Sequence, residues 1–176
     1  NNTDLMTPDF PGAVIQVVQG IKTDTFSTSA NLQTKAAVTG LSASITPTSA
    51  TNKILVCLNL MGGGDRDTTF GGTILRDTTE IGIADASGSR TRNTFGMGIR
   101  ANYNGIAQGS DWVTGNICCN VLDSPATTSA ITYSVKIGGN GSSTVTVNFD
   151  ERNQDSATDT NIASSAITLY EIVASS

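Results

Sequence analysis

The side chains that could do chemistry in this chain are mostly carboxylates, because its 176 residues include no histidine. Without an imidazole there is no Ser-His-Asp or Cys-His nucleophile and no histidine-bound zinc. A glycosidase needs two carboxyl groups about 5 to 10 Å apart. The chain has only three glutamates, and most of its aspartates fall in turn-type sequence, where aspartate caps and bends the backbone. We therefore expect a protein with no catalytic residues and no cofactor.

The densest set of oxygen ligands lies between residues 150 and 159, where Asp150, Glu151, Asp155 and Asp159 follow closely on one another. Calcium takes about six to eight oxygen ligands, so such a segment could hold the ion. It lacks the Asp-x-Asp-x-Asp-Gly spacing of a dedicated calcium loop. A solvated acidic loop is the favoured interpretation, and a metal site is the alternative.

Aromatic and polar residues near one expected turn could recognise a ligand. The tryptophan and the tyrosines lie in or beside strand-like sequence, where core or subunit-interface packing is the plain interpretation. The alternative is a sugar-stacking platform at a loop, because loops carried by a rigid β scaffold often make the binding contacts. The candidate recognition residues are Arg100, Tyr103, Asn104 and Trp112, with Asp65 and Asp67 as neighbours.

The cysteines number three, so they cannot all pair within one chain. Cys118 and Cys119 are adjacent on an expected strand, where successive side chains point to opposite faces and cannot easily form a bridge. Together with Cys57 they are expected to be small, reduced core residues. This predicts folding in a reducing cytosol without a disulfide framework.

The composition excludes several classes of partner. A net charge of −5, with only ten scattered basic residues, argues against nucleic acid. No apolar run approaches the roughly 18 residues of a membrane span, and no signal peptide is evident. Only 5% of the residues are aromatic, which predicts a thin core for one chain. We therefore expect the chain to pack against copies of itself.

The expected elements are β-strands joined by turns. Residues 1–12 form an extended arm or linker, either free or lying across a neighbouring subunit, and residues 13–176 form one domain. Residues 53–61 alternate as a central strand that is buried on both faces. Hairpins are expected between strands 68–77 and 80–85, 93–103 and 111–123, and 131–137 and 145–149, with further strands at 13–21, 41–45 and 167–173. This predicts an all-β, antiparallel, jelly-roll-like sandwich.

Five segments, in their order and spacing, carry a family resemblance. They resemble the C-terminal domains of tail-fibre-like and virion surface proteins of tailed bacteriophages and marine cyanophages. The resemblance covers roughly residues 12–173 and implies a non-enzymatic virion protein that is usually a homotrimer. It brings no catalytic residues. The segments are residues 12–29, 38–60, 74–92, 122–139 and 167–173.

The resemblance and the composition together predict a structural protein on the surface of a phage particle, assembled in the cytoplasm of the host bacterium. Its expected place is a trimeric tail fibre or receptor-binding domain. A trimeric capsid decoration protein on the phage head is one alternative, and a free carbohydrate-binding, lectin-like module is another. The expected partners are further copies of the chain, other virion proteins and a host surface glycan or receptor, with no nucleic acid and no membrane insertion.

Overall fold

The computed structural model describes residues 10–64, 68–98, 113–149 and 161–174, and these form strands joined by turns and links. Nothing in these ranges is a helix that is long and apolar enough to cross a membrane. The strands are β1 (Val14–Lys22), β2 (Phe26–Thr28), β3 (Ala36–Ile45), β4 (Lys53–Gly64), β5 (Thr69–Arg76), β6 (Thr79–Ile81), β7 (Phe95–Gly98), β8 (Val113–Asp123), β9 (Ile131–Gly138), β10 (Val145–Val147) and β11 (Ser165–Ile172).

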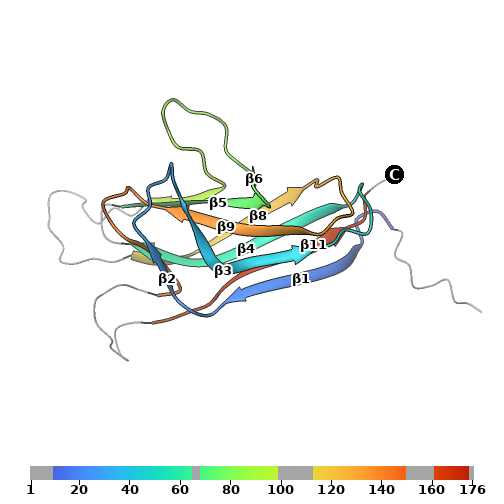
Figure 1. Ribbon diagram of the computed structural model, residues 1–176, viewed down its shortest axis with the longest axis horizontal. Helices are drawn as coiled ribbons and strands as arrows, with labels where there is room; N and C mark the ends of the chain where they lie inside the picture. Colours follow the sequence, from blue (N-terminus) through green and yellow to red (C-terminus); the bar gives the residue numbers. More distant parts are fainter. Residues whose placement is uncertain (1–9, 65–67, 99–112, 150–160, 175–176) are drawn as a thin grey trace, which may run out of the picture.

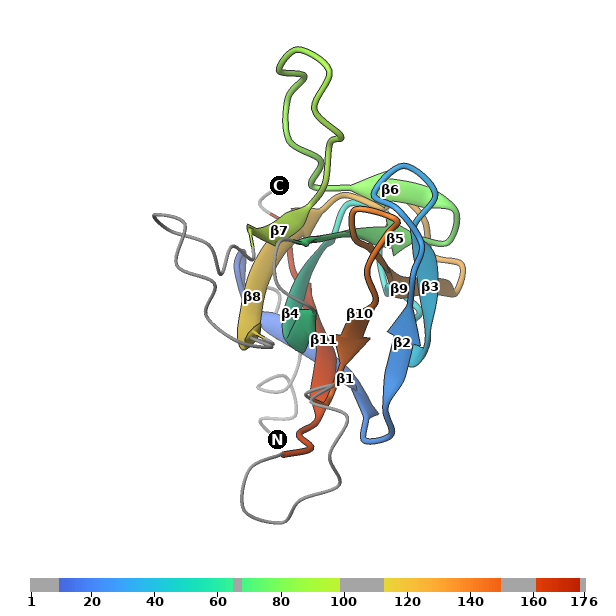
Figure 2. The ribbon, with the colours of Figure 1, turned by 90° about the vertical axis from the view of Figure 1, so that its left-hand side faces the viewer.

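Two antiparallel sheets lie face to face (Figures 1 and 2). In the first sheet β4 pairs with β8 on one edge and with β11 and then β10 on the other, while β1 lies beside β11 and β2 beside β10. In the second sheet β9 lies between β3 and β5, and β6 and β7 both pair with the far edge of β5. The prediction of an antiparallel all-β fold built from two sheets is confirmed.

The core lies between the sheets and is made mainly of aliphatic side chains. On β4, Ile54, Val56, Leu58 and Leu60 are each no more than 2% exposed and point inward. Burying such a side chain stabilises the fold by roughly 1.5–3 kcal/mol. The other face of β4 is not buried in the same way, because Leu55 and Cys57 are half-buried and Asn59 is exposed. The central position of this strand is confirmed, but the prediction that both of its faces are buried is wrong for the single chain.

One of the three expected hairpins forms. Strands β5 and β6 meet across a tight turn, with Arg76 opposite Thr79 and Asp77 at φ 51°. The other two are wrong, because β7 pairs with β5 while β8 pairs with β4, and β9 lies in the second sheet while β10 lies in the first. After β9 the chain crosses between the sheets beside residues 30–32, where the backbone of Asn31 leaves no room for a side chain at Gly138. The glycine-rich segment after β9, which suggested a hairpin turn, instead lets the backbone pass close to Asn31.

One short strand and the first part of another could not be predicted from the sequence. β2 has only three residues, too few to show an alternating pattern. In β3 the pairing register shifts between Ala37 and Ser42, and Gly40 takes φ 84°. This irregularity turns Val38 and Leu41, which are three positions apart, toward the same core. The strict alternation therefore starts only at Leu41, where the predicted strand began.

Along one side of the sandwich, β1 of the first sheet contacts β3 of the second sheet. Gly20 on β1 lies so near the backbone of β3 that a Cβ there would overlap the carbonyl oxygen of Ser42. A larger residue would force the sheets apart at this point. Gly20 is therefore needed for close packing of the sandwich.

The sandwich has two distinct ends (Figure 1). At one end, here called the terminal end, Gly12 N donates to Val173 O at 2.9 Å, and the links 46–52 and 124–130 lie nearby. At the opposite end, called the loop end, Gly64 pairs with Val113 and Thr69 pairs with Gly98. The chain thus enters and leaves the sandwich at one end, and the strand ends that flank residues 65–67 and 99–112 lie at the other.

Candidate functional site

The candidate recognition residues, namely Arg100, Tyr103, Asn104, Trp112, Asp65 and Asp67, fall outside the described residues, as does the acidic segment 150–159. What the structure does place is the strand ends beside them. Because Gly64 lies opposite Val113, the segments 65–67 and 99–112 both leave from the loop end of β4 and β8. Their proximity at the points of attachment agrees with the idea that Asp65 and Asp67 neighbour the loop with the two aromatic residues, which stays a prediction.

The carboxylates that the structure describes are not gathered into a metal site. Among the described residues, no group of three or more His, Cys, Asp and Glu side chains could hold an ion. Two carboxylates of the described part of the chain are buried, and they tie parts of the fold together. Asp123 joins the two sheets, and Glu171 holds the link between β3 and β4.

Asp123 lies at the end of β8 and accepts hydrogen bonds from the second sheet. Arg76 Nη1 donates to both of its carboxylate oxygens at 2.9 Å, and Tyr133 Oη donates to Oδ2 at 2.7 Å. Burial, and then the hydrogen bond to Asp123, raises the pKa of the Tyr133 hydroxyl. Tyr133 is fully buried in the core, so this cluster ties the two sheets together.

Glu171 on β11 points into the sandwich and is fully buried. Its Oε1 accepts hydrogen bonds from Thr48 N at 2.6 Å, Thr48 Oγ1 at 2.7 Å and Asn52 Nδ2 at 2.7 Å. Burial alone raises the pKa of this carboxyl, but the hydrogen bonds from Asn52 and Thr48 outweigh it, so the pKa lies below its usual value. A charged Glu171 therefore anchors the β3–β4 link at the terminal end.

The cysteines differ from one another in exposure, and all three are free. Cys119 lies opposite Leu58 and packs against the core, where burial raises the pKa of its thiol. Cys118 lies opposite Asn59 on the other face and is exposed. The absence of a bridge between these neighbours follows from their opposite directions. The expectation that all three are core residues is wrong for Cys57 and Cys118, because both point to the outward face of the first sheet, where Cys57 is half-buried and Cys118 is exposed.

The outward face of the first sheet carries four apolar side chains in one line across four strands. We call this set, Val17, Tyr170, Leu55 and Leu122, the apolar row. Val17 on β1 lies opposite Tyr170 on β11, which lies opposite Leu55 on β4, which lies opposite Leu122 on β8. Val17 is 57% exposed and Leu122 is 60% exposed, while Tyr170 and Leu55 are half-buried. Side chains in such a row contact their cross-strand neighbours. The result is a continuous apolar band with no described element covering it.

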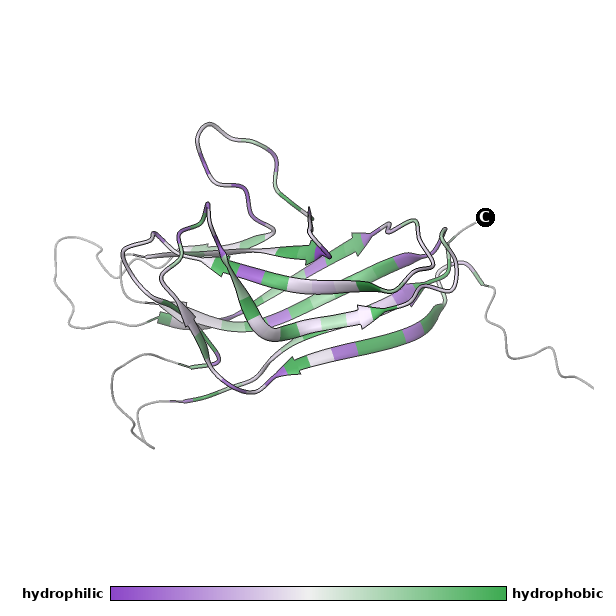
Figure 3. Ribbon diagram, in the orientation of Figure 1, coloured by the Kyte–Doolittle hydropathy of each residue, from purple (hydrophilic) through white to green (hydrophobic). Residues whose placement is uncertain are grey.

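More apolar side chains flank the apolar row along β1. Val14 and Ile21 are also about half exposed, at 50% and 55%, and Figure 3 shows β1 coloured as hydrophobic over much of its length. Elsewhere on this outward face the side chains are mostly neutral and polar, and Gln19 Nε2 donates to Thr168 Oγ1 across β1 and β11 at 2.8 Å. Of the described residues of β1, β11, β4 and β8, only Lys53 brings a charge to this face.

The outward face of the second sheet is quite different along β3 and β9. There hydroxyl side chains stand opposite each other, with Ser42 facing Ser134 and Ser44 facing Thr132. The hydroxyls of Ser44 and Thr132 are hydrogen-bonded at 2.7 Å. The sandwich therefore has a hydroxyl-lined outer face along β3 and β9 and an apolar outer face on the first sheet.

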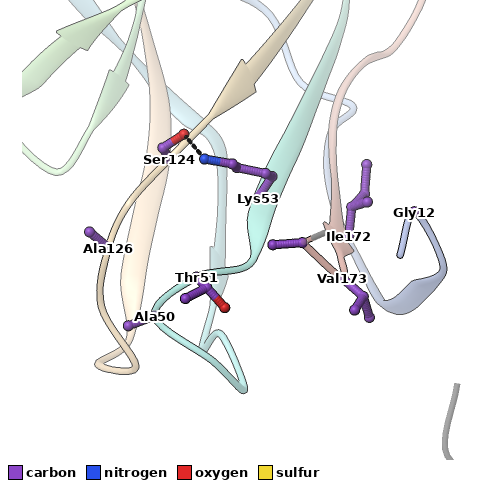
Figure 4. A pocket seen from close by; sticks show the side chains of 9 residues that line it. Gly12, Ala50, Thr51, Lys53, Ser124, Ala126, Ile172 and Val173 are labelled. Carbon is purple, nitrogen blue, oxygen red and sulfur yellow. Dashed lines mark hydrogen bonds between the residues drawn. The ribbon is translucent and has the colours of Figure 1, made fainter. Parts of the chain in front are cut away.

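A shallow pocket of about 610 Å³ lies at the terminal end of the apolar face (Figure 4). Lys53 forms one side, with its Nζ donating to Ser124 Oγ at 2.7 Å, and Ile172 and Val173 form another. Ile172 and Lys53 are paired across β11 and β4, two positions from Tyr170 and Leu55 of the apolar row. The pocket is therefore continuous with the apolar face. Its lining residues are Gly12, Ala50, Thr51, Lys53, Ser124, Ala126, Ile172, Val173 and Ala174.

Comparison with known proteins gives no family. No family model matches the chain, and no curated protein matches it. Among solved structures it is similar to a chain in the structure of the Gx strain of infectious bursal disease virus, with a TM-score of 0.40 and 14% identity over 91% of this chain. It is also similar to a mutant VP2 protein of the same virus in derived T=1 particles, with a TM-score of 0.39 and 15% identity over 89% of this chain. This chain spans 36% of the length of either protein, and likenesses this remote assign neither fold nor function.

Proposed function

We propose that this chain is a non-enzymatic structural protein on the surface of a virus particle, in the position of a tail fibre or receptor-binding domain that assembles as a homotrimer. The proposal starts from the resemblance of residues 12–173 to virion surface domains of tailed phages. It agrees with the absence of histidine from the sequence and with the structural use of Asp123 and Glu171.

The observation that carries the proposal is the separation of the two ends of the sandwich. Gly12 and Val173 are hydrogen-bonded at the terminal end, which suits attachment to a larger assembly. The strands that flank residues 65–67 and 99–112 end at the opposite pole. A receptor-binding module needs this separation, because its loops must face outward while its chain ends face the particle.

Adsorption to host cells tests the tail-fibre role. We expect the double substitution Tyr103→Ala with Trp112→Ala to weaken adsorption of particles while the protein remains folded and incorporated. Phe10→Ala is the matched control, because it also removes an aromatic ring that is 78% exposed but lies at the terminal end. Adsorption should be unchanged in that control.

Two other outcomes would replace the proposal. Normal adsorption by the double variant, with the chain found on the head in images of intact particles, would favour the capsid decoration role. Glycan binding by the isolated chain, together with its absence from particles, would favour the free carbohydrate-binding module.

A further inference from the structure

We propose that the outward face of the first sheet, formed by β1, β11, β4 and β8 around the apolar row, is the surface on which a second copy of this chain packs. The inference deepens the proposed function, since it names the surface through which copies would meet in a particle. It commits to one occupant, a second copy, for reasons of polarity, charge and size.

The polarity of the face is that of an interface core. Val17 and Leu122 are each more than half exposed at the two edges of the sheet, and Leu55 and Tyr170 join them across its centre. Isolated exposed apolar residues are common, but a continuous apolar band on a folded surface marks a contact site. The hydroxyl-lined outer face along β3 and β9 gives the contrast within the same molecule.

Charge favours a second copy as the occupant. The chain carries a net charge of −5, so two copies repel each other wherever their acidic surfaces meet. The described strands of this face bring no carboxylate to it, and its single cation, Lys53, lies at the margin and is hydrogen-bonded to Ser124. A copy of the chain can therefore pack on this face without setting its carboxylates against carboxylates of the face.

The polar side chains among the apolar ones are also suited to a contact between copies. Gln19, Asn59 and Asn120 are neutral amides, each able to donate and to accept a hydrogen bond. A neighbouring copy of the chain presents both donors and acceptors to this face, and each amide can pair with either. A partner with a charged binding surface would leave its charges unpaired here.

The size of the face fits a stable pair. Four strands spaced about 4.8 Å apart, with about 3.3 Å per residue, make a face of roughly 600 Å² in plan. The accessible area is larger than this plan area, because the side chains project from the sheet and the walls of the adjoining pocket, about 610 Å³ in volume, add surface. A standard protein interface buries about 800 Å² of accessible surface on each partner. The face thus provides most of the area that a specific contact between copies requires.

Association of the purified chain tests the inference. We expect the wild type to form dimers or larger assemblies at micromolar concentrations in sedimentation and light-scattering measurements. Val17→Lys and Leu122→Lys each place a charge on the apolar row and should raise the dissociation constant at least about tenfold, or about 1.4 kcal/mol. Both positions are exposed in the single chain, so circular dichroism spectra should show that the variants remain folded. Ser42→Lys makes the same change in charge on the outer face of the other sheet and should leave association unchanged.

The thiol of Cys118 gives a second measurement on the same face. Cys118 is exposed on the same outward face, four residues along β8 from Leu122. Its reaction with a thiol reagent should slow as the wild type is concentrated, whereas in the Leu122→Lys variant the rate should not depend on concentration. The Cys118→Ser variant identifies which phase of the reaction belongs to this thiol.

Several results would overturn the inference. One is a wild type that stays monomeric over the whole concentration range. Another is Ser42→Lys weakening association as much as Val17→Lys and Leu122→Lys do. A third is a reaction of Cys118 with the thiol reagent that does not slow when the chain assembles. Protection of Cys118 in particles by a different virion protein, with a monomeric pure chain, would also overturn it and would remove the homotrimer, while the proposed place on the particle surface stands. Association through this face by a chain that is absent from particles would leave the inference in place and remove the proposed function.

Discussion

At the scale of single residues, two buried carboxylates connect parts of the fold: Glu171 anchors the β3–β4 link, and Asp123 joins the two sheets. Glu171 is fully buried with three hydrogen bonds to one of its oxygens, and Asp123 receives Arg76 from the opposite sheet. A buried carboxylate is costly unless it accepts hydrogen bonds, and both of these carboxylates accept several. Removing either would leave its donors without partners inside the sandwich, which costs more than an exposed ion pair contributes.

Glu171→Gln should lower the free energy of unfolding by about 1–3 kcal/mol at neutral pH, because an amide cannot accept all the hydrogen bonds that the carboxylate accepts. The pKa of Glu171 is lower in the folded chain than in the unfolded one. Its contribution to stability is therefore fully present above the unfolded pKa and is lost as the pH falls through the folded pKa. Wild type and variant should accordingly converge in acid. Denaturation in urea at neutral pH and near pH 3 measures both effects.

Glu80→Gln is the control for this experiment, because Glu80 is 46% exposed and its ion pair with Lys35 is 3.5 Å long. It should change stability little at either pH. If Glu171→Gln proved as harmless as Glu80→Gln at neutral pH, Glu171 would not anchor the β3–β4 link as we describe.

At the scale of elements, strand positions could be predicted from the sequence but their partners could not. The alternation of Ile54, Val56, Leu58 and Leu60 marks β4 because one face of a strand meets the core. Both sheets of a sandwich show the same alternation, so the pattern does not tell which sheet a strand joins. β9 and β10 follow each other across a glycine-rich segment and still belong to different sheets. Pairing is decided by contacts between distant segments, which local sequence does not contain.

Gly20→Ala should destabilise the protein by about 1–3 kcal/mol, because the added methyl group would overlap the Ser42 carbonyl oxygen where β1 approaches β3. Thermal unfolding followed by circular dichroism measures the loss. Gly98→Ala is the matched control, since a Cβ at Gly98 meets nothing within 4 Å. Equal melting temperatures for the two variants would show that the sheets can separate at β1 and β3 without cost.

At the scale of the whole molecule, the apolar face depends on pairing between segments far apart in the chain. Leu55 stands in residues 53–61, the stretch expected to be buried on both faces, and Val17, Leu122 and Tyr170 stand in other expected strands. That they form one row follows only from the registers of three strand pairs. The sequence could therefore predict surplus apolar surface but not its location. For the candidate recognition loop, the structure describes only the flanking strands.

The unfolding of the chain should be a single cooperative transition. The chain passes repeatedly between the two sheets, from β3 to β4, from β4 to β5 and from β9 to β10, so neither sheet can unfold and leave the other whole. Far-ultraviolet circular dichroism, which follows the strands, and near-ultraviolet circular dichroism, which follows packed aromatic side chains such as that of buried Tyr133, should give one midpoint. Two separate midpoints would contradict the prediction that residues 13–176 form one domain.

The hydrogen bonds between Gly12 and Val173 and between Val173 and Ala13 have a mechanical consequence. They close the terminal end, where β1 begins beside the end of β11, its antiparallel neighbour. A force that pulls these two strand ends apart acts along the hydrogen bonds, which lie across the strands, and loads them one pair at a time. Under such a force β1 and β11 would separate one hydrogen-bonded pair after another, starting from the terminal end, and a modest force would suffice. A force applied along the strands would load many pairs at once and meet far greater resistance.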